Sequence, residues 1–331
     1  MNDLAGKKVF VTGAGGFIGS HLTEALVDIG CEVTAMIRYT SRSDWGNLEF
    51  LPTEKKTSLR VVRGTIEDPH FIAAHVKGKD VVFHLAALIG IPYSYVAPQS
   101  YIRTNIEGTT NILEAARVYG VSRIVHTSTS ECYGTARYIP IDEAHPLQPQ
   151  SPYSATKIGA DMIADSFYRS FGTPVATVRP FNTYGPRQSS RAVIPTIISQ
   201  ALGSPSEVRL GSLAPVRDLT FVKDTVQGFI KVAENDEAIG KILNLGACKG
   251  ITIGDLAKLI LQIAEVDKPV VHEKARDRPA ESEVFELVAD NSQAKKALGW
   301  MPQYSLKEGL AETIDFVSEH LYLFKVGEYA I

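Results

Sequence analysis

The 331-residue sequence has little cysteine and no repeated metal-ligand spacing. Its three cysteines, Cys31, Cys132 and Cys248, are scattered and odd in number, which argues against a disulfide framework and suits a reduced compartment. None of the eight histidines has another histidine four residues away or joins a Cys–His cluster. We therefore expect no metal site.

Two further classes of protein are excluded by what the chain lacks. A formal net charge of -3 provides no basic excess for nucleic acid. No apolar stretch reaches the ~20 residues that a membrane-spanning helix needs, and residues 1–8 lack the apolar segment of a signal peptide. The length allows one large or two modest domains, and we expect a cytoplasmic protein.

What the sequence does have is a hydroxyl-rich cluster at the end of an apolar run. The β-branched residues of 124–127 lead into Thr129, Ser130 and Glu131. Such a run predicts a buried strand, and the polar residues after it predict a pocket at the strand end.

A helix with a reactive pair of side chains is expected over 152–171. Ser151 suits the N-cap, Pro152 suits the first turn, and Tyr153 and Lys157 then share one helix face. An ammonium beside a phenol favours the phenolate, so we expect a lowered Tyr153 pKa and a base for a sugar hydroxyl. The alternative is an ordinary amphipathic surface helix, which the preceding polar strand end and an N-terminal glycine turn make the weaker reading.

That glycine turn follows the first expected strand, Lys8–Thr12, and precedes an expected helix over 20–29. Glycines permit a tight turn and close backbone approach, and a helix N-terminus attracts phosphates. The pattern predicts a dinucleotide pyrophosphate site, against the alternative of a plain turn. Its candidate residues are Gly13, Gly16, Phe17, Ile18 and Gly19.

The end of the second expected strand, 31–37, bears on the choice of cofactor. Rossmann proteins that prefer NAD usually carry an acidic residue there. Here Arg38 stands among hydroxyl residues, which favours the 2′-phosphate of NADP. A solvated basic loop is an almost equal alternative.

Two further strand ends complete the expected cofactor site. Thr65 and Ile66 follow the third strand, at a position that often meets adenine, whereas Asp68 before a proline suits a helix cap equally well. The fourth strand ends at His84, expected to be a packed strand residue, and the small residues after it would let the cofactor pass: Leu85, Ala86 and Ala87. Asn105 is expected to bridge buried backbone groups behind the site.

Six strand–helix units in succession predict an α/β fold with a Rossmann-type, doubly wound parallel sheet. The nucleotide-binding domain would cover residues 1–180, with 218–248 returning to it. Residues 181–217 and 249–331 would form a smaller C-terminal α/β lobe for the substrate, with the ligand site in the cleft between them. Arg187, Arg217 and Arg278 lie on loops of this lobe and would converge on a diphosphate, unless they are unrelated surface residues.

Together these residues resemble the extended short-chain dehydrogenase/reductases that act on nucleotide sugars. The matching motifs are Thr12-Gly13-x-x-Gly16-x-x-Gly19, Tyr153-x-x-x-Lys157, Arg179-Pro180-Phe181-Asn182 and Arg217-Asp218. The resemblance implies tightly bound, recycled NADP or NAD, a homodimer through helices 100–119 and 152–171, and a Thr129–Tyr153 hydroxyl pair. It also implies that Asn182, Arg217 and Arg278 hold the substrate diphosphate.

Within that family, Glu131 separates the activities. The 4-epimerases usually carry a small or hydroxyl residue at this position, whereas 4,6-dehydratases and UDP-glucuronate decarboxylases carry Glu. Similarity at Trp45-Gly46, 87–94 and 191–195 points to UDP-N-acetylglucosamine 4,6-dehydratases of the legionaminic acid type. The last of these segments contains Val193, a substrate-binding candidate.

The resemblance implies a three-step conversion to a UDP-4-keto-6-deoxy sugar. The steps are oxidation at C4, elimination of water across C5–C6, and reduction at C6. Thr129 and Tyr153 would act on O4, and Glu131 would act on the C5 proton. Ser130 is a further catalytic candidate beside them. The alternatives are a UDP-hexose 4-epimerase, a UDP-glucuronate decarboxylase, and a non-catalytic, cofactor-sensing regulator.

Overall fold

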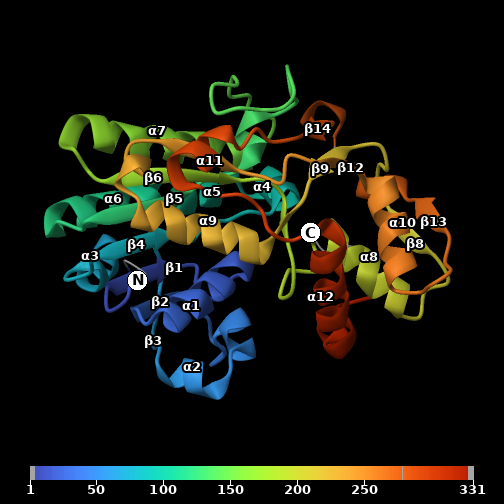
Figure 1. The fold of residues 1–331 in the computed structure, drawn as a ribbon, viewed down its shortest axis with the longest axis horizontal. Coiled ribbons are helices and arrows are strands. Elements are labelled where there is room, and N and C mark those ends of the chain that lie inside the picture. Colours follow the sequence, from blue (N-terminus) through green and yellow to red (C-terminus); the bar gives the residue numbers. More distant parts are fainter. Residues whose placement is uncertain (1–3, 278, 327–331) are drawn as a thin grey trace.

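The structure is a computed structural model that describes residues 4–277 and 279–326. Its centre is a seven-stranded, all-parallel sheet (Figure 1). The strand order is β11-β6-β5-β4-β1-β2-β3. The bounds are β1 Lys8–Thr12, β2 Glu32–Arg38, β3 Arg60–Gly64, β4 Val81–His84, β5 Arg123–Thr127, β6 Val175–Pro180 and β11 Ile242–Leu245. This confirms the predicted doubly wound α/β sheet and adds β11 as a seventh strand.

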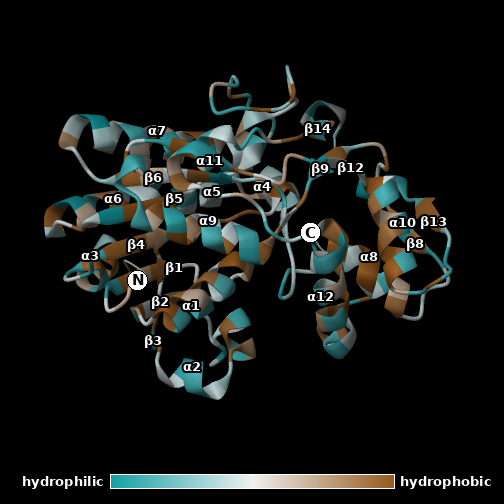
Figure 2. Ribbon diagram, viewed as in Figure 1, coloured by the Kyte–Doolittle hydropathy of each residue, from teal (hydrophilic) through white to brown (hydrophobic). Residues whose placement is uncertain are grey.

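Helices cover both faces of the sheet because alternate strand residues point to opposite sides. Val9 and Val11 join the core beneath α1 (Phe17–Ile29) and α9 (Val222–Glu234), while Phe10 joins the core on the other face. That second core lies beneath α3 Pro69–Val76, α6 Gly108–Tyr119 and α7 Pro152–Phe171. In Figure 2 the strands are mainly hydrophobic, whereas the helices carry both colours.

A smaller lobe lies beside the carboxyl ends of the strands, on the right of Figure 1. Its helices are α8 Val193–Leu202, α10 Ile253–Ile263 and α12 Leu306–Glu319. Its short strands form three small sheets, which pair β7 Thr183–Tyr184 with β10 Thr220–Phe221, β8 Val208–Leu210 with β13 Val270–His272, and β9 Val216–Asp218 with β12 Gly250–Thr252 and β14 Glu286–Leu287. One apolar core runs from the sheet into this lobe, so the two parts pack as one body.

Short helices connect these layers. They are α2 Thr53–Thr57, α4 Ile91–Val96, α5 Pro98–Tyr101 and α11 Ser292–Leu298. Within the described ranges, no helix is both long and apolar enough to cross a membrane.

The helix expected over 100–119 is interrupted by a π-helical segment, Ile102–Glu107, between α5 and α6. This segment turns Asn105 into the interior, where its Oδ1 accepts from the Leu88 N–H at 2.9 Å. Its Nδ2 donates to the Leu88 carbonyl and to Thr156 Oγ1, both at 3.0 Å. The expected bridging role of Asn105 is confirmed, and the π segment is what provides it. Periodicity alone did not reveal the interruption, because one extra residue per turn hardly alters an apolar stripe.

Candidate active site

A cavity of about 680 Å³ extends from the glycine turn to the carboxyl ends of β5 and β6. This is the point where strand order reverses between β1 and β4, which is the usual ligand crevice of such sheets. All residues predicted for the cofactor except Lys157 line it: Gly13, Gly16, Phe17, Ile18, Gly19, Arg38, Thr65, Ile66, Leu85, Ala86, Ala87 and Tyr153. Thr129, Ser130, Glu131 and Asn182 line the same cavity.

The glycine turn leaves no room for side chains where the backbone must pass closely. Gly13 has φ +70°, and a Cβ there would lie 2.8 Å from the Ala86 nitrogen. A Cβ on Gly19 would lie 2.1 Å from the Gly13 carbonyl oxygen. The N-cap of α1 is Gly16, and no side chain caps the first turn, so its N–H groups suit a phosphate. These residues therefore fit a dinucleotide.

A buried hydrogen-bond chain fixes the turn against β4. Thr12 Oγ1 accepts from the Leu85 and Ala86 N–H groups, each at 3.1 Å, and meets His84 Nδ1 at 2.9 Å. Burial lowers the pKa of His84 well below its ordinary value, and the nearby charge of Lys157 lowers it further. The imidazole is thus neutral, and its Nε2 donates to Thr109 at 3.0 Å. This is the packed strand residue that the sequence predicted, not a catalyst.

The end of the cavity beside β2 and β3 carries charges of both signs. Arg38 lies there, exposed, at the end of β2, and Asp44 lies in the loop that follows. Glu67 lines the wall beside Thr65 and Ile66. Asp68, by contrast, caps α3 by accepting from His70 N at 2.9 Å, so the helix-cap reading of that residue is confirmed. Sequence reasoning missed Asp44 and Glu67 because neither follows a strand directly.

The catalytic candidates lie at the other end of the cavity. After β5, a 3-10 turn over Ser130–Tyr133 begins, and Thr129 Oγ1 caps it by accepting from the Glu131 N–H at 3.2 Å. The Thr129 hydroxyl is also hydrogen-bonded to Tyr153. Tyr153 begins α7 behind a capping box formed by Ser151 and Ser154, as the serine and proline predicted. Two hydroxyls therefore meet at one point of the cavity wall, beside the side chain of Glu131.

The predicted lowering of the Tyr153 pKa is wrong for this structure. Burial raises the pKa of the phenol far above its ordinary value, and the hydrogen bond with Thr129 opposes that rise only in part. Lys157 Nζ donates to the Thr127 carbonyl at 2.6 Å, and Lys157 is buried behind the cavity wall. For Lys157, burial lowers the pKa, and the carboxylate of Asp161 opposes this lowering. Helical spacing correctly predicted the helix face of the Lys157 ammonium. It did not predict that the ammonium donates to the Thr127 carbonyl.

Three polar atoms on the cavity wall are buried without a hydrogen-bond partner among the described residues. They are Thr127 Oγ1, Asn182 Oδ1 and Gln188 Oε1. The amide of Gln188 is held through Nε2, which donates to the Thr183 carbonyl at 2.9 Å. Buried polar atoms normally have partners. These therefore suit a ligand with hydroxyl or amide groups, and sequence reasoning missed Gln188.

The model of the family described as GDP-mannose 4,6 dehydratase matches residues 10–313. The chain belongs to this family. A dTDP-glucose 4,6-dehydratase from Streptomyces antibioticus is 32% identical, over 94% of this chain and 92% of the relative.

Solved structures of two activities resemble this member of the family. A dTDP-glucose 4,6-dehydratase from Streptomyces venezuelae with NAD bound has a TM-score of 0.87 and 30% identity, over 96% of this chain and 99% of that one. A UDP-N-acetylglucosamine 4-epimerase from Methanobrevibacter ruminantium, in complex with UDP-N-acetylmuramic acid, has a TM-score of 0.86 and 31% identity, with the same coverage of 96% and 99%.

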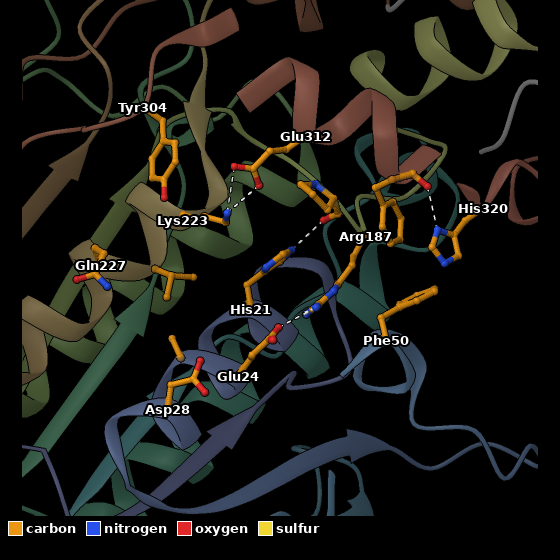
Figure 3. A pocket seen from close by; sticks show the side chains of 14 residues that line it. His21, Glu24, Asp28, Phe50, Arg187, Lys223, Gln227, Tyr304, Glu312 and His320 are labelled. Atoms are coloured by element: carbon orange, nitrogen blue, oxygen red, sulfur yellow. Dashed lines mark hydrogen bonds and ion pairs between the residues drawn. The ribbon is translucent and has the colours of Figure 1, made fainter. Parts of the chain in front are cut away.

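Of the three arginines expected on the substrate diphosphate, the structure places Arg187 away from the larger cavity. Arg187 lines a separate cavity of about 560 Å³, where its Nη2 meets Glu24 of α1 at 2.7 Å (Figure 3). Arg217 is buried against the Val216 carbonyl and Glu283 and is not among the residues that line the larger cavity. Val193 opens α8 and packs on the core, whereas its neighbour Ala192 lines the cavity. Arg278 lies outside the described residues.

The glycine turn yields a direct test. Gly19→Ala should weaken NAD(P)H binding by about tenfold or more, because the added Cβ would displace the turn that is to receive the pyrophosphate. Fluorescence titration of the reduced cofactor measures this. Gly254→Ala in α10 is the matched control, because its Cβ would meet nothing nearer than 3.5 Å. Equal affinity in Gly19→Ala and wild type would contradict the assignment.

Proposed function

We propose that this chain is a nucleotide-sugar 4,6-dehydratase with UDP-N-acetylglucosamine as its substrate. The observation that carries the proposal is the side chain of Glu131 on the cavity wall beside the Thr129–Tyr153 hydroxyl pair. Redox chemistry at C4 needs only the hydroxyls, whereas elimination needs a base for the C5 proton.

The proposed substrate has support from both the sequence and the relatives. Ile89, Ile91 and Ala192 come from the segments that resemble UDP-N-acetylglucosamine 4,6-dehydratases, and all three line the cavity. A relative that is named for UDP-N-acetylglucosamine has nearly the same fold. Residues 1–180 and 218–248 would hold the cofactor, and 181–217 and 249–331 the sugar nucleotide, with Asn182 at its diphosphate.

The cofactor is proposed to be NADP or NAD, held tightly and recycled. The glycine turn would take the pyrophosphate, Arg38 the adenosine ribose, Thr65 and Ile66 the adenine, and the wall at 85–87 the nicotinamide half. Bound in its oxidised form, it would accept hydride from C4 of the sugar and return it to C6.

The residues of the chain would move the protons. Burial keeps the Tyr153 phenol protonated in this structure. The positive charge of an oxidised nicotinamide bound beside it would favour the phenolate, and Tyr153, hydrogen-bonded to Thr129, would then take the O4 proton as the C4 hydride departs. The resulting 4-ketone acidifies the C5 proton, which Glu131 removes. Glu131 then gives that proton to the C6 hydroxyl as it leaves as water, because Ser130 is a weak acid with no charge. Glu131 finally takes up one proton and delivers it to C5 as hydride returns to C6, while Tyr153 releases the O4 proton to solvent, so the protons balance.

A 4-epimerase is the second candidate, since a solved 4-epimerase is as similar to the chain as a solved dehydratase. Only the dehydratase loses water, so product mass distinguishes them. A glucuronate decarboxylase would lose carbon dioxide instead, and a cofactor-sensing regulator would not turn over.

The first prediction from this proposal concerns Glu131. Glu131→Gln should slow loss of water by ~10²–10⁴ while hydride transfer continues, so that reduced nicotinamide and a 4-keto hexose accumulate. Absorbance of the reduced cofactor and product mass with UDP-N-acetylglucosamine measure the two steps. Tyr153→Phe should show neither. A 6-deoxy product formed by Glu131→Gln at the wild-type rate would refute the role of this residue.

The second prediction concerns the cofactor. NADP(H) should bind at least as well as NAD(H), and Arg38→Ala should cost NADP(H) about tenfold in affinity because a charge-assisted contact to the 2′-phosphate is lost. Arg42→Ala is the control, since Arg42 is exposed in the same loop but is not among the cavity residues. The mass of cofactor released on denaturation identifies what the protein holds. Finding NAD alone would sink the idea.

The third prediction concerns assembly. Val118, Met162 and Phe171 are exposed apolar residues on α6 and α7, and we propose that a second copy covers them in a symmetric dimer. Met162→Glu should yield monomers at micromolar concentration, because the two-fold axis would bring like charges together. Met301→Glu, at an equally exposed methionine outside both helices, should stay dimeric. Sedimentation velocity decides, and a monomeric wild type would disprove the dimer.

A further inference from the structure

A buried carboxylate lies on α7 two turns beyond Tyr153. Asp161 follows Lys157 by four residues, so all three side chains share one face of the helix. The Asp161 side chain is 0% exposed. A charge in such a place is tolerated only where other groups pair with it and donate to it.

Its partners come from the strand that carries the catalytic turn. Asp161 Oδ2 accepts from Ser128 Oγ at 2.7 Å, and Oδ1 meets His126 Nε2 at 3.1 Å. Between these two residues, the Thr127 carbonyl accepts from Lys157 at 2.6 Å. Helix α7 therefore forms hydrogen bonds with three consecutive residues at the end of β5, residues 126–128. Thr129, the partner of Tyr153, is the next residue in the chain.

A second set of contacts extends to β6. Arg179 donates to Asp161 Oδ2 through Nη2 at 2.8 Å and Nε at 3.2 Å. Its Nη1 donates to the Tyr133 hydroxyl at 3.1 Å, and the guanidinium lies 5.0 Å from the centre of that ring. Tyr133 closes the 3-10 turn that begins at Ser130, so residues on both sides of Glu131, Ser128 before the turn and Tyr133 at its end, are connected to this carboxylate.

The protonation states are consistent with this arrangement. Burial raises the pKa of Asp161, but the hydrogen bond from His126 and the charge of Arg179 outweigh it and lower the pKa to about 2. Burial lowers the pKa of His126, so the ring is neutral and donates through Nε2. One carboxylate thus receives four hydrogen bonds from three side chains.

We propose that Asp161 is a positioning residue for hydride transfer, which holds the end of β5 so that the Thr129 hydroxyl stays against Tyr153. The inference rests on the proposed function, because it assigns Asp161 to the redox half of that reaction. A merely structural ion pair would affect the stability of the fold and leave the chemistry of the folded enzyme unchanged. A positioning residue affects the rate, since small misplacements at a reacting centre cost up to about 10²-fold.

The experiment compares Asp161→Asn, Ser128→Ala and wild type, with NADP⁺ and UDP-N-acetylglucosamine, below the lowest melting temperature. Asp165→Asn is the matched control, because it makes the same substitution one turn further along α7, in a surface pair with Arg169. Single-turnover formation of reduced cofactor measures hydride transfer. Steady-state kcat, KM and the isotope effect of deuterium at C4 are measured beside it.

Asp161→Asn should lower the hydride-transfer rate about tenfold to a hundredfold, with KM within about threefold of wild type and a larger C4 isotope effect on kcat. Ser128→Ala should lower it by about threefold to tenfold, and it retains the Asp161–Arg179 pair if Asp161→Asn fails to fold. Asp165→Asn should match wild type. Wild-type hydride transfer in Ser128→Ala, and in Asp161→Asn wherever that variant folds, would overturn the inference. A wild-type enzyme that transfers no hydride would overturn the proposed function instead.

Discussion

The ion pair between Asp161 and Arg179 is the interaction on which the end of β5 and the turn after it depend. Both side chains are almost wholly buried, so each would be costly alone, and together they join α7 to β6. Asp161 also accepts hydrogen bonds from Ser128 and His126. The pair therefore ties the end of β5 to both α7 and β6. The hydrophobic effect brings these elements together without regard to direction, whereas charged hydrogen bonds specify where each strand must end.

A second buried network plays the same part for the cofactor end. It runs from Thr12 through His84 and Thr109 to the Asn105 carbonyl, and it reaches α7 where Asn105 donates to Thr156. The two networks meet at neighbouring positions of β4 and β5, where the rings of His84 and His126 stack with centroids 5.8 Å apart. Both imidazoles have a lowered pKa through burial, so this contact carries no like-charge repulsion near neutral pH. The glycine turn after β1 and the 3-10 turn after β5 are thereby positioned against the same pair of neutral histidines.

The features that could be predicted from the sequence are those written in local spacing. The glycine turn, the Ser151 cap and the shared face of Tyr153 and Lys157 depend on residues within about two helical turns, and the structure shows each of them. The errors concern partners that are distant in the chain. Arg187 pairs with Glu24, 163 residues away, and the Tyr153 pKa follows burial that no local pattern reveals. Asp161 had a local signal, its spacing of eight from Tyr153, but its four hydrogen bonds come from β5, from Ser128 just after it, and from β6.

The candidate catalytic residues are held by the scaffold to different degrees. Thr129 and Tyr153 belong to segments held by the two networks, so under the proposed function the scaffold would set the geometry for removing hydride from C4. Glu131 lies in the short turn between Ser130 and Tyr133, where the ends are tied and the side chain lines the cavity. Under the proposed function, a substitution at Glu131 would therefore change what happens after oxidation without disturbing the oxidation itself. Such a separation fits the finding that a solved 4,6-dehydratase and a solved 4-epimerase resemble this chain to nearly the same degree. The redox step would then depend on the buried networks, and the fate of the ketone on the turn that carries Glu131.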